Sequence, residues 1–330
     1  MKKRNVVTDL AIEAHEMLCE EQEASFIDGV VVNEQEFCNG EIRVVHVKIT
    51  NENGENQLRK PIGNYITIES AAVKERDKET HEEIIKVLAD IVGNLHGLKS
   101  DGVILVVGLG NRNVTPDALG PRAAEKVLVT RHLKNEGIIP KELEGKVRAV
   151  ASISPGVLGI TGIETYEIVK GVTDRIKPDL IIAIDALAAR ELSRINSTIQ
   201  ISDTGISPGA GMGNKRVELN EKTLGVKVIA IGVPTVVDAA TMVNDVLDGI
   251  LSDLQAESNS GAAFYSIIKE LSSEEKYPMI LSALEPYDGN MFVTPKEVDD
   301  VVNDLSVIIA NGLNIALNQG VGKGDVWRYG

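Results

Sequence analysis

The sequence predicts an α/β protein whose doubly wound, mostly parallel sheet is flanked by helices. The first observation behind this prediction is a set of apolar runs without alternating polar positions, at residues 103–107, 147–153, 179–184 and 226–231. The second is that segments with helical patterning lie between or after these runs, near residues 118–133, 162–175 and 234–254. Strands that are apolar on both faces and are separated by helices are typical of a parallel sheet covered on both sides.

Residues 10–100 have a different character and predict a smaller N-terminal lobe that contains strands. Residues 41–49 and 64–69 alternate well enough for two strands. A long helix follows, which Thr80 begins as part of a capping box and which Gly97 ends.

The remainder of the chain divides into the α/β core, at residues 101–255, and a more polar region at 256–330. The sequence Thr294-Pro295 precedes a further helix, with proline at a position that favours a helix start. We therefore expect a helical C-terminal region packed on the core.

Composition and charge exclude several classes of protein. The chain has 330 residues and a net charge of −15, so general nucleic-acid binding and attachment to anionic membranes are not expected. No apolar stretch reaches the roughly 20 residues of a membrane span, and acidic residues interrupt the segment after the basic start, so no signal peptide is expected. The two cysteines, Cys19 and Cys38, give no disulfide framework, which favours a cytoplasmic protein.

Asp117 follows the first buried strand of the core. Thr115 and Pro116 suit the start of a helix, which places Asp117 in its first turn. Taken alone, this pattern favours a carboxylate that only complements the helix dipole.

Asp185 follows the most apolar predicted strand, at 179–184. Burial of a carboxylate is costly unless it is paired or hydrogen-bonded, so Asp185 is expected to have a structural partner or a functional role. A salt bridge to Arg190, or a cap on the next segment, is the structural alternative. If the strands are parallel, Asp117 and Asp185 both lie at carboxyl ends and face one crevice. Paired carboxylates of this kind supply one acid and one base for the activation of water.

Glycine-rich loops occur at several predicted strand ends. The sequence Gly108-Leu-Gly110-Asn111 follows a buried strand, but Asn113 replaces the third glycine of a dinucleotide-binding fingerprint, and no nucleoside-triphosphate loop is present. No nucleotide cofactor is expected. The loop that contains Ser154 and Gly156 is either a peptide-binding loop or a simple turn, and no histidine lies nearby to activate the serine.

Two further aspartates are weaker candidates. Asp203-Thr204-Gly205 matches the motif of pepsin-like proteases, but those are all-β proteins with two such motifs, so we interpret it as a polar turn before the Gly-rich segment 208–214. Thr235 with Asp238 predicts a capping pair at a helix start.

Taken together, the motifs resemble the germination protease family of spore-forming bacteria, which is related in fold to hydrogenase maturation proteases. The matching stretches are Gly108–Asn111, Asn113–Pro121, Ser154–Thr165, Ile184–Arg190, Asp203–Asn214 and Gly232–Ala239. Each motif alone is common, whereas the ordered set is specific.

The resemblance implies an atypical aspartic-type endopeptidase that degrades small acid-soluble spore proteins during germination, in the cytoplasm of the spore core, as a homotetramer. Its two essential aspartates fall on Asp117 and Asp185. Hydrogenase maturation proteases use these positions with another residue to hold a metal, but no histidine is placed here for that third role, so no metal is expected. A metal-dependent peptidase of that type, or a non-catalytic factor that binds spore proteins, remains the alternative. Residues expected to support the site or bind substrate are Asn111, Ser154, Gly156, Arg190 and Asp203.

The resemblance also implies a zymogen that removes its own N-terminal segment. The family's substrates are cut between an acidic residue and a following apolar residue and alanine, and Asp9-Leu10-Ala11 has this form. We therefore predict self-cleavage between Asp9 and Leu10, which releases residues 1–9 as a propeptide. The alternative is that Asp9 only caps a helix through Leu10–Leu18.

Overall fold

The computed structural model describes residues 8–22, 26–75, 77–97, 101–139, 141, 144–209, 216–244, 246–247, 279–280, 282–284, 291–318 and 320. Most of the predicted propeptide, most of the Gly-rich segment 208–214, the end of the helix predicted near 234–254 and much of the region after 256 lie outside these residues.

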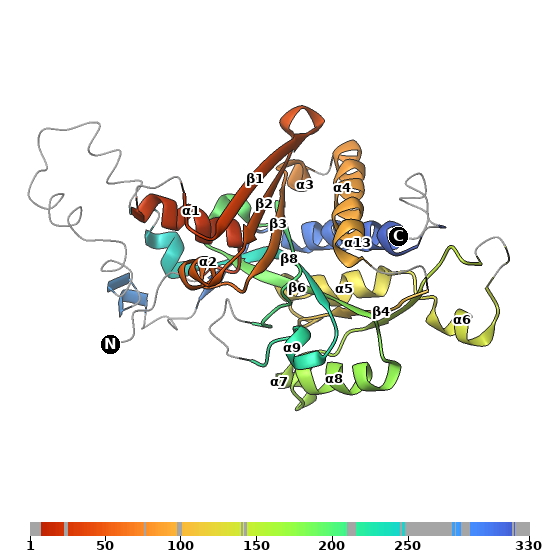
Figure 1. The fold of residues 1–330 in the computed structure, drawn as a ribbon. Coiled ribbons are helices and arrows are strands. Elements are labelled where there is room, and N and C mark those ends of the chain that lie inside the picture. Colours follow the sequence, from red (N-terminus) through yellow and green to blue (C-terminus); the bar gives the residue numbers. More distant parts are fainter. Residues whose placement is uncertain are drawn as a thin grey trace, which may run out of the picture.

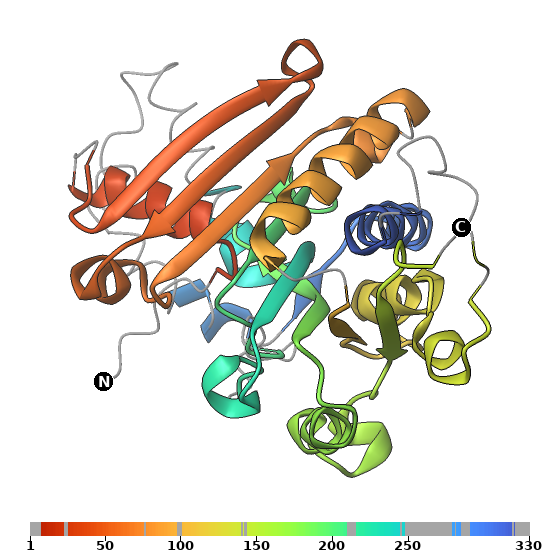
Figure 2. The same cartoon turned by 45° about the vertical axis from the view of Figure 1, so that its right-hand side comes forward.

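Within the described residues, nine strands form one sheet in the order β1-β2-β3-β7-β8-β6-β4-β5, with β9 paired to β8. The strands are β1 (Val30–Phe37), β2 (Ile42–Ile49), β3 (Gly63–Glu69), β4 (Val103–Gly108), β5 (Ala149–Ile153), β6 (Leu180–Ala189), β7 (Thr198–Ser202), β8 (Val228–Asp238) and β9 (Phe292–Val293). Figure 1 and Figure 2 show the long hairpin strands of the N-terminal part continuing into the strands of the core.

The sheet confirms the predicted α/β class, but it is mixed. Only β5, β4, β6 and β8 run parallel to one another, and the other pairs are antiparallel. The short strand β7, which the sequence reading did not identify as a strand, pairs with β3 on one side and β8 on the other. Because of this link, the N-terminal strands extend the same sheet.

Helices cover both faces of the sheet. The α-helices are α1 (Ala11–Gln22), α2 (Glu52–Leu58), α3 (Ala72–Glu75), α4 (Lys78–His96), α5 (Leu119–Lys126), α6 (Arg131–Glu136), α7 (Leu158–Thr161), α8 (Thr165–Ile176), α9 (Glu221–Leu224) and α13 (Val298–Leu317). Apolar side chains of α4, α5 and α13 share one core cluster with one face of the central strands, and α8 and α9 contribute to a cluster on the other face. Figure 2 shows α4, α5 and α13 side by side, with α8 apart from them.

Local signals explain the two long helices. The side chain of Asp77 accepts a hydrogen bond from the Thr80 backbone N–H, so the residue that caps α4 is Asp77, three residues before the predicted cap at Thr80. The helix ends as predicted at Gly97, which has a φ of +60°. Helix α13 is long and apolar enough to cross a membrane, yet most of it is buried in the protein, as in the core helices of other proteins.

Strands β6 and β8 continue beyond their predicted ends at 184 and 231. They remain paired from Asp185–Gly232 to Ala189–Val237, and Leu187, Ala189 and Val237 are buried against the N-terminal segment. The predicted Thr235 cap is therefore wrong, because Thr235 lies within β8. Asp238 ends the strand, and its carboxylate accepts the backbone N–H of Thr241 at 3.1 Å.

The strand order reverses beside β4. After β4 the chain forms β5 on one side and then crosses to form β6 on the other side. In α/β proteins the crevice outside the carboxyl ends of the strands at such a reversal is the usual ligand site. Asp117 follows β4 and Asp185 lies on β6, so both belong to this crevice.

Candidate active site

Asp117 and Asp185 line one cavity of about 350 Å³. Its other lining residues are Asp9, Val114, Pro116, Ala186, Leu187, Ala188, Ser207, Gly209, Thr235, Val236, Phe292 and Thr294. The cavity thus brings together both predicted catalytic aspartates and the first residue of the predicted self-cleavage pair.

The loop after β4 holds Asp117 in a short 3-10 helix, η2 (Thr115–Asp117). The backbone N–H of Asn111 donates to the Asp117 Oδ2 atom at 2.6 Å. Gly110 has a φ of +112°, and a Cβ atom there would lie 2.1 Å from the Asp117 carbonyl oxygen. The Gly108–Asn111 motif is therefore a tight turn that orients the Asp117 carboxylate.

Close backbone packing brings this loop to β6. A Cβ atom on Gly120 would lie 2.2 Å from the Leu109 carbonyl oxygen and 2.4 Å from that of Ile184, the residue before Asp185. The Leu109 N–H donates to the same Ile184 carbonyl at 2.8 Å. Glycine at position 120 lets the start of α5 approach the end of β4 and places Asp117 beside β6.

Asp185 is buried, with 5% of its surface exposed. Its carboxylate accepts a hydrogen bond from the Ala186 backbone N–H at 2.9 Å. Burial raises the pKa of Asp185 well above its ordinary value, and the nearby charges of Asp117 and Asp9 add to this effect.

Asp117 is half-buried, and burial also raises its pKa, while the hydrogen bond from Asn111 stabilises the ionised form and opposes the rise. Asp185 is more deeply buried and takes the larger shift. The two carboxyl groups are therefore unequal, and Asp185 holds its proton to a higher pH than Asp117 does.

Asp9 docks on an edge of β6. The Ala188 backbone N–H donates to the Asp9 carboxylate at 2.9 Å, and the Asp9 N–H donates to the Ala188 carbonyl at 3.3 Å. Backbone groups of alternate residues point to the same side of a strand. The Ile184 carbonyl bonds Leu109 on the side of β6 that faces β4, and the backbone groups of Ala188, four residues later, point to the same side. Asp9 therefore pairs with the part of this β6 edge that lies beyond the end of β4.

The alternative role of Asp9 as a helix cap is not what the contacts show. Helix α1 begins at Ala11, and the Asp9 carboxylate bonds Ala188 instead. The hydroxyl of Thr8 accepts the Leu10 N–H at 3.0 Å and donates to Glu13. Burial raises the pKa of Asp9 as well.

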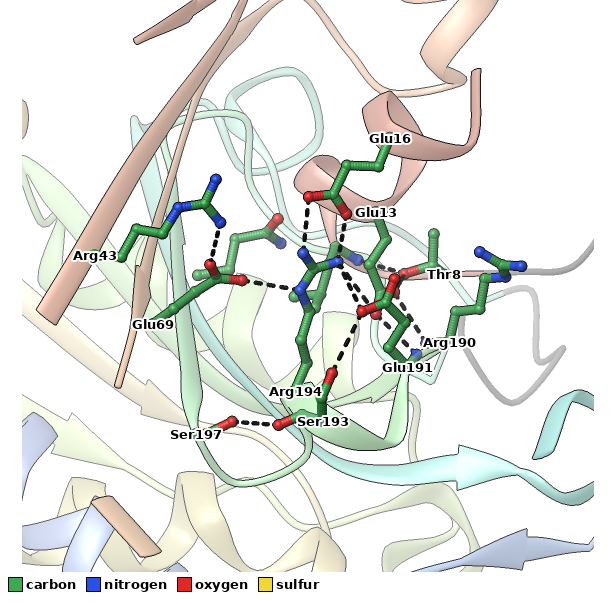
Figure 3. Close-up of polar contacts among 12 residues, drawn as sticks. Thr8, Glu13, Glu16, Arg43, Glu69, Arg190, Glu191, Ser193, Arg194 and Ser197 are labelled. Carbon is green, nitrogen blue, oxygen red and sulfur yellow. Dashed lines mark hydrogen bonds and ion pairs between the residues drawn. The ribbon is translucent and has the colours of Figure 1, made fainter. Parts of the chain in front are cut away.

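A network of charged side chains fixes α1 beside the site (Figure 3). Arg194 is buried and donates to both carboxylate oxygens of Glu16, at 2.7 and 2.9 Å, and to Glu69 at 2.8 Å. Glu13 is 1% exposed and accepts the backbone N–H groups of Arg190 and Glu191 at 2.9 and 3.0 Å. The helix that follows Asp9 and Leu10 is thereby tied to the chain that follows β6.

The predicted supporting residues fall in different places. Asn111 orients Asp117 through its backbone, and Arg190 anchors Glu13 through its backbone. Ser154 and Gly156 follow β5, outside the cavity lining. Asp203 accepts the backbone and side-chain N–H groups of Asn64, at 2.8 and 2.7 Å, and so joins the chain after β7 to β3.

Two cavity residues were missed as site residues. The Thr235 hydroxyl donates to the Pro116 carbonyl at 2.7 Å, one residue before Asp117, and the Thr294 hydroxyl donates to the Thr235 carbonyl at 2.8 Å. The sequence analysis did identify Thr235, but it predicted only a residue that caps a helix. No local pattern relates Thr294 to a residue 59 positions earlier.

Among the described residues, no group of three or more histidine, cysteine, aspartate or glutamate side chains is arranged to hold a metal ion.

Comparison with known proteins gives one consistent result. The sequence model of the germination protease family matches residues 11–263 and 252–330. The germination protease of Clostridium tetani is 51% identical over 98% of this chain and 99% of its own length. Those of Caldanaerobacter subterraneus and Bacillus pumilus are 49% and 43% identical, over 95% and 98% of this chain and 94% and 96% of their own lengths. The chain therefore belongs to the germination protease family and is a peptidase.

Proposed function

We propose that this peptidase is an endopeptidase of aspartic type, in which Asp117 is the base and Asp185 the acid. The observation that carries the proposal is the pair of unequal carboxyl groups on one cavity. At a pH between the two pKa values, Asp117 is ionised and Asp185 is protonated. This is the combination that the activation of water by a carboxylate pair requires.

The proposed reaction follows from these two states. Asp117 takes a proton from water while the water oxygen bonds to the peptide carbonyl carbon, and the carbonyl oxygen becomes an oxyanion. Asp185 gives its proton to the leaving nitrogen as the carbon–nitrogen bond breaks. Passage of the proton from Asp117 to Asp185 restores the starting state. Because the two carboxyl groups are coupled, the pKa values seen in the pH dependence of the rate describe the pair together and not either residue alone.

The proposed substrates are small acid-soluble spore proteins, and the proposed precursor cuts itself between Asp9 and Leu10. The position of Asp9 beside both catalytic aspartates supports this proposal. Leu10 and Ala11 are buried in an apolar cluster with Leu187 and Ala189, which suits an apolar residue followed by alanine. A homotetramer in the cytoplasm of the spore core belongs to the same proposal.

The test is intact-mass analysis of the full-length wild type and of the Asp117→Asn and Asp185→Asn variants. Each protein is incubated with a small acid-soluble spore protein in the presence of a chelator, and Asp174→Asn serves as the control because Asp174 lies in an exposed pair with Lys170 on α8. We expect wild type and control to cut the substrate and to acquire Leu10 as a new N-terminus, and both active-site variants to remain intact and inactive.

Full activity of either active-site variant would overturn the aspartic mechanism. Activity that appears only when a metal is added would favour a metallopeptidase. Binding of the substrate without cutting, under every condition, would favour a non-catalytic factor.

A further inference from the structure

The carbonyl oxygen of Asp9, which belongs to the proposed cut bond, accepts two side-chain hydrogen bonds. Lys60 Nζ donates to it at 2.9 Å and Gln200 Nε2 at 3.1 Å. Neither residue has a part in the mechanism given above. Lys60 lies in the connection between α2 and β3, and Gln200 lies in β7, the strand that pairs with β3.

Gln200 also binds the chain on the other side of that bond. Its Oε1 atom accepts the Ala11 backbone N–H at 2.7 Å. One primary amide therefore holds the carbonyl before the bond and the N–H of the second residue after it. This fixes the direction of the chain through the cavity and does not depend on the side chains that are bound.

Strand register places Gln200 opposite Asp185. Gln200 and Asp185 both pair with Gly232 of β8, one from each side. Directly paired residues project to the same face of a sheet, and neighbouring strands lie about 4.8 Å apart, so the two side chains lie on one face about 10 Å apart. Gly232 has no side chain, and the side chain of Leu187 lies over it, since a Cβ atom at position 232 would be 2.4 Å from Leu187 Cδ1. A carbonyl group held by Gln200 therefore lies over the same face of the sheet as Asp185, at the same level along the strands.

The geometry points to Lys60 and Gln200 as the groups that hold the carbonyl of the cut bond and stabilise the negative charge that forms on its oxygen. This inference rests on the proposed function. When water adds, the carbonyl π electrons move to oxygen, and the two N–H donors, already directed at that atom, bind the oxyanion more strongly than the neutral carbonyl. Gln200 in addition recognises the backbone N–H two residues past the cut.

The test uses the full chain for self-cleavage and its trimmed form for cutting a synthetic peptide with the sequence of residues 4–16. We expect Lys60→Met to lower kcat about 100-fold with little change in KM, as for the loss of one oxyanion donor. Gln200→Met should lower kcat by a similar factor and also raise KM about 5- to 10-fold, because it loses the hydrogen bond to the Ala11 N–H as well. Lys60→Arg should restore part of the loss. Lys74→Met is the matched control, because Lys74 also donates to a backbone carbonyl, that of Ser193, outside the cavity.

A second peptide tests the contact in the unaltered enzyme. In this peptide, lactic acid replaces the residue that corresponds to Ala11. An ester oxygen then stands in place of the Ala11 N–H, and the donor to Gln200 is lost. We expect KM to rise about 5- to 10-fold for wild type, as for one lost hydrogen bond, and not to change for Gln200→Met. A role of Gln200 confined to capping α1 would leave the two peptides equal in wild type.

The outcomes separate the two proposals. A wild type that cuts neither itself nor the peptide contradicts the proposed function. A wild type that cuts both, with Lys60→Met and Gln200→Met equally fast and the ester peptide bound equally well, overturns the carbonyl site alone.

Discussion

Burial raises the pKa of Asp185, and the charge of Asp117, across the cavity that both side chains line, raises this pKa further. The coupling has a direct test. Asp117→Asn removes the charge but keeps the shape, so the pKa of Asp185 should fall, as followed by carbon NMR of labelled aspartate. Asp174→Asn should leave it unchanged. An Asp185 pKa that is the same in Asp117→Asn and wild type would show that the charge of Asp117 does not contribute to the shift.

The rate of self-cleavage should have a bell-shaped dependence on pH. It rises as Asp117 ionises, and because the pKa of Asp117 is raised, this limb lies above the ordinary value of 3.8. It falls at higher pH as Asp185 loses its proton. Initial rates by mass spectrometry between pH 4 and 9 would check this. A rate that still increases beyond the pH at which NMR shows Asp185 ionised would contradict its role as the acid.

Asp185→Asn should be inactive but more stable than wild type at neutral and higher pH. The pKa of Asp185 is raised in the folded state, so the folded protein binds this proton more tightly, and stability is lost as pH rises from the ordinary pKa of 3.8 through the folded value. The neutral amide removes that loss. We expect a gain of at least about 1 kcal/mol, or roughly 2–4 °C in Tm, by thermal unfolding at pH 8. At pH 3.5 the difference should disappear, and an equal gain at both pH values would contradict the electrostatic origin.

Gly120→Ala should reduce activity strongly, because the added methyl group meets the carbonyl oxygens of Leu109 and Ile184 at 2.2 and 2.4 Å. Relief of these contacts moves the Asp117 loop away from β6. Gly171→Ala is the control, since a Cβ atom at this position in α8 has no neighbour within 4 Å. The control should keep full activity and gain up to about 1 kcal/mol of stability from helix propensity. Equal peptidase rates for the two variants would show that the close approach at Gly120 is dispensable.

Arg194→Met should destabilise the protein by about 3 kcal/mol, because it leaves the buried carboxylate of Glu13 and the partly buried carboxylate of Glu16 without their cation, while Glu69 keeps its ion pair with Arg43. Urea unfolding would measure this change, and hydrogen exchange should show faster opening of α1. Lys170→Met breaks an exposed pair with Asp174 on α8 and should shift Tm by no more than about 2 °C. Unchanged exchange in α1 of Arg194→Met would contradict the anchoring role of the network.

The sequence predicted most of the core but not how the sheet extends. Apolar runs identified β4, β5 and the first halves of β6 and β8, because strands buried on both faces need apolar residues throughout. Strand β1 was missed because all of its residues after Val30 are exposed, so no alternation marks it. The ends of β6 and β8 depend on pairing with each other and on burial under residues 10–12, which are distant in the chain.

The candidate site shows the same division. Asp117 was predictable because a carboxylate after a buried strand of a parallel sheet lies at the edge where sites form. Asp185 was expected at the end of its strand but lies within β6, and it reaches the same crevice because β4 stops pairing at Ile184, one residue earlier. Lys60 and Gln200 were not predictable, since each binds the Asp9 carbonyl across a separation of 51 or 191 residues. No periodicity or motif in the sequence predicts a contact over such a distance. Lys60 and Gln200 meet the Asp9 carbonyl only because of the path that the chain takes before α1.

The docking of Asp9 on its own β6 edge also has a kinetic consequence. On the proposed function, the bond to be cut and the groups that cut it belong to one molecule, so no collision between two copies is needed. Self-processing is then a first-order reaction, and its half-time is the same in dilute and concentrated solution. On this proposal, the amount of precursor that a cell accumulates does not advance the moment of activation.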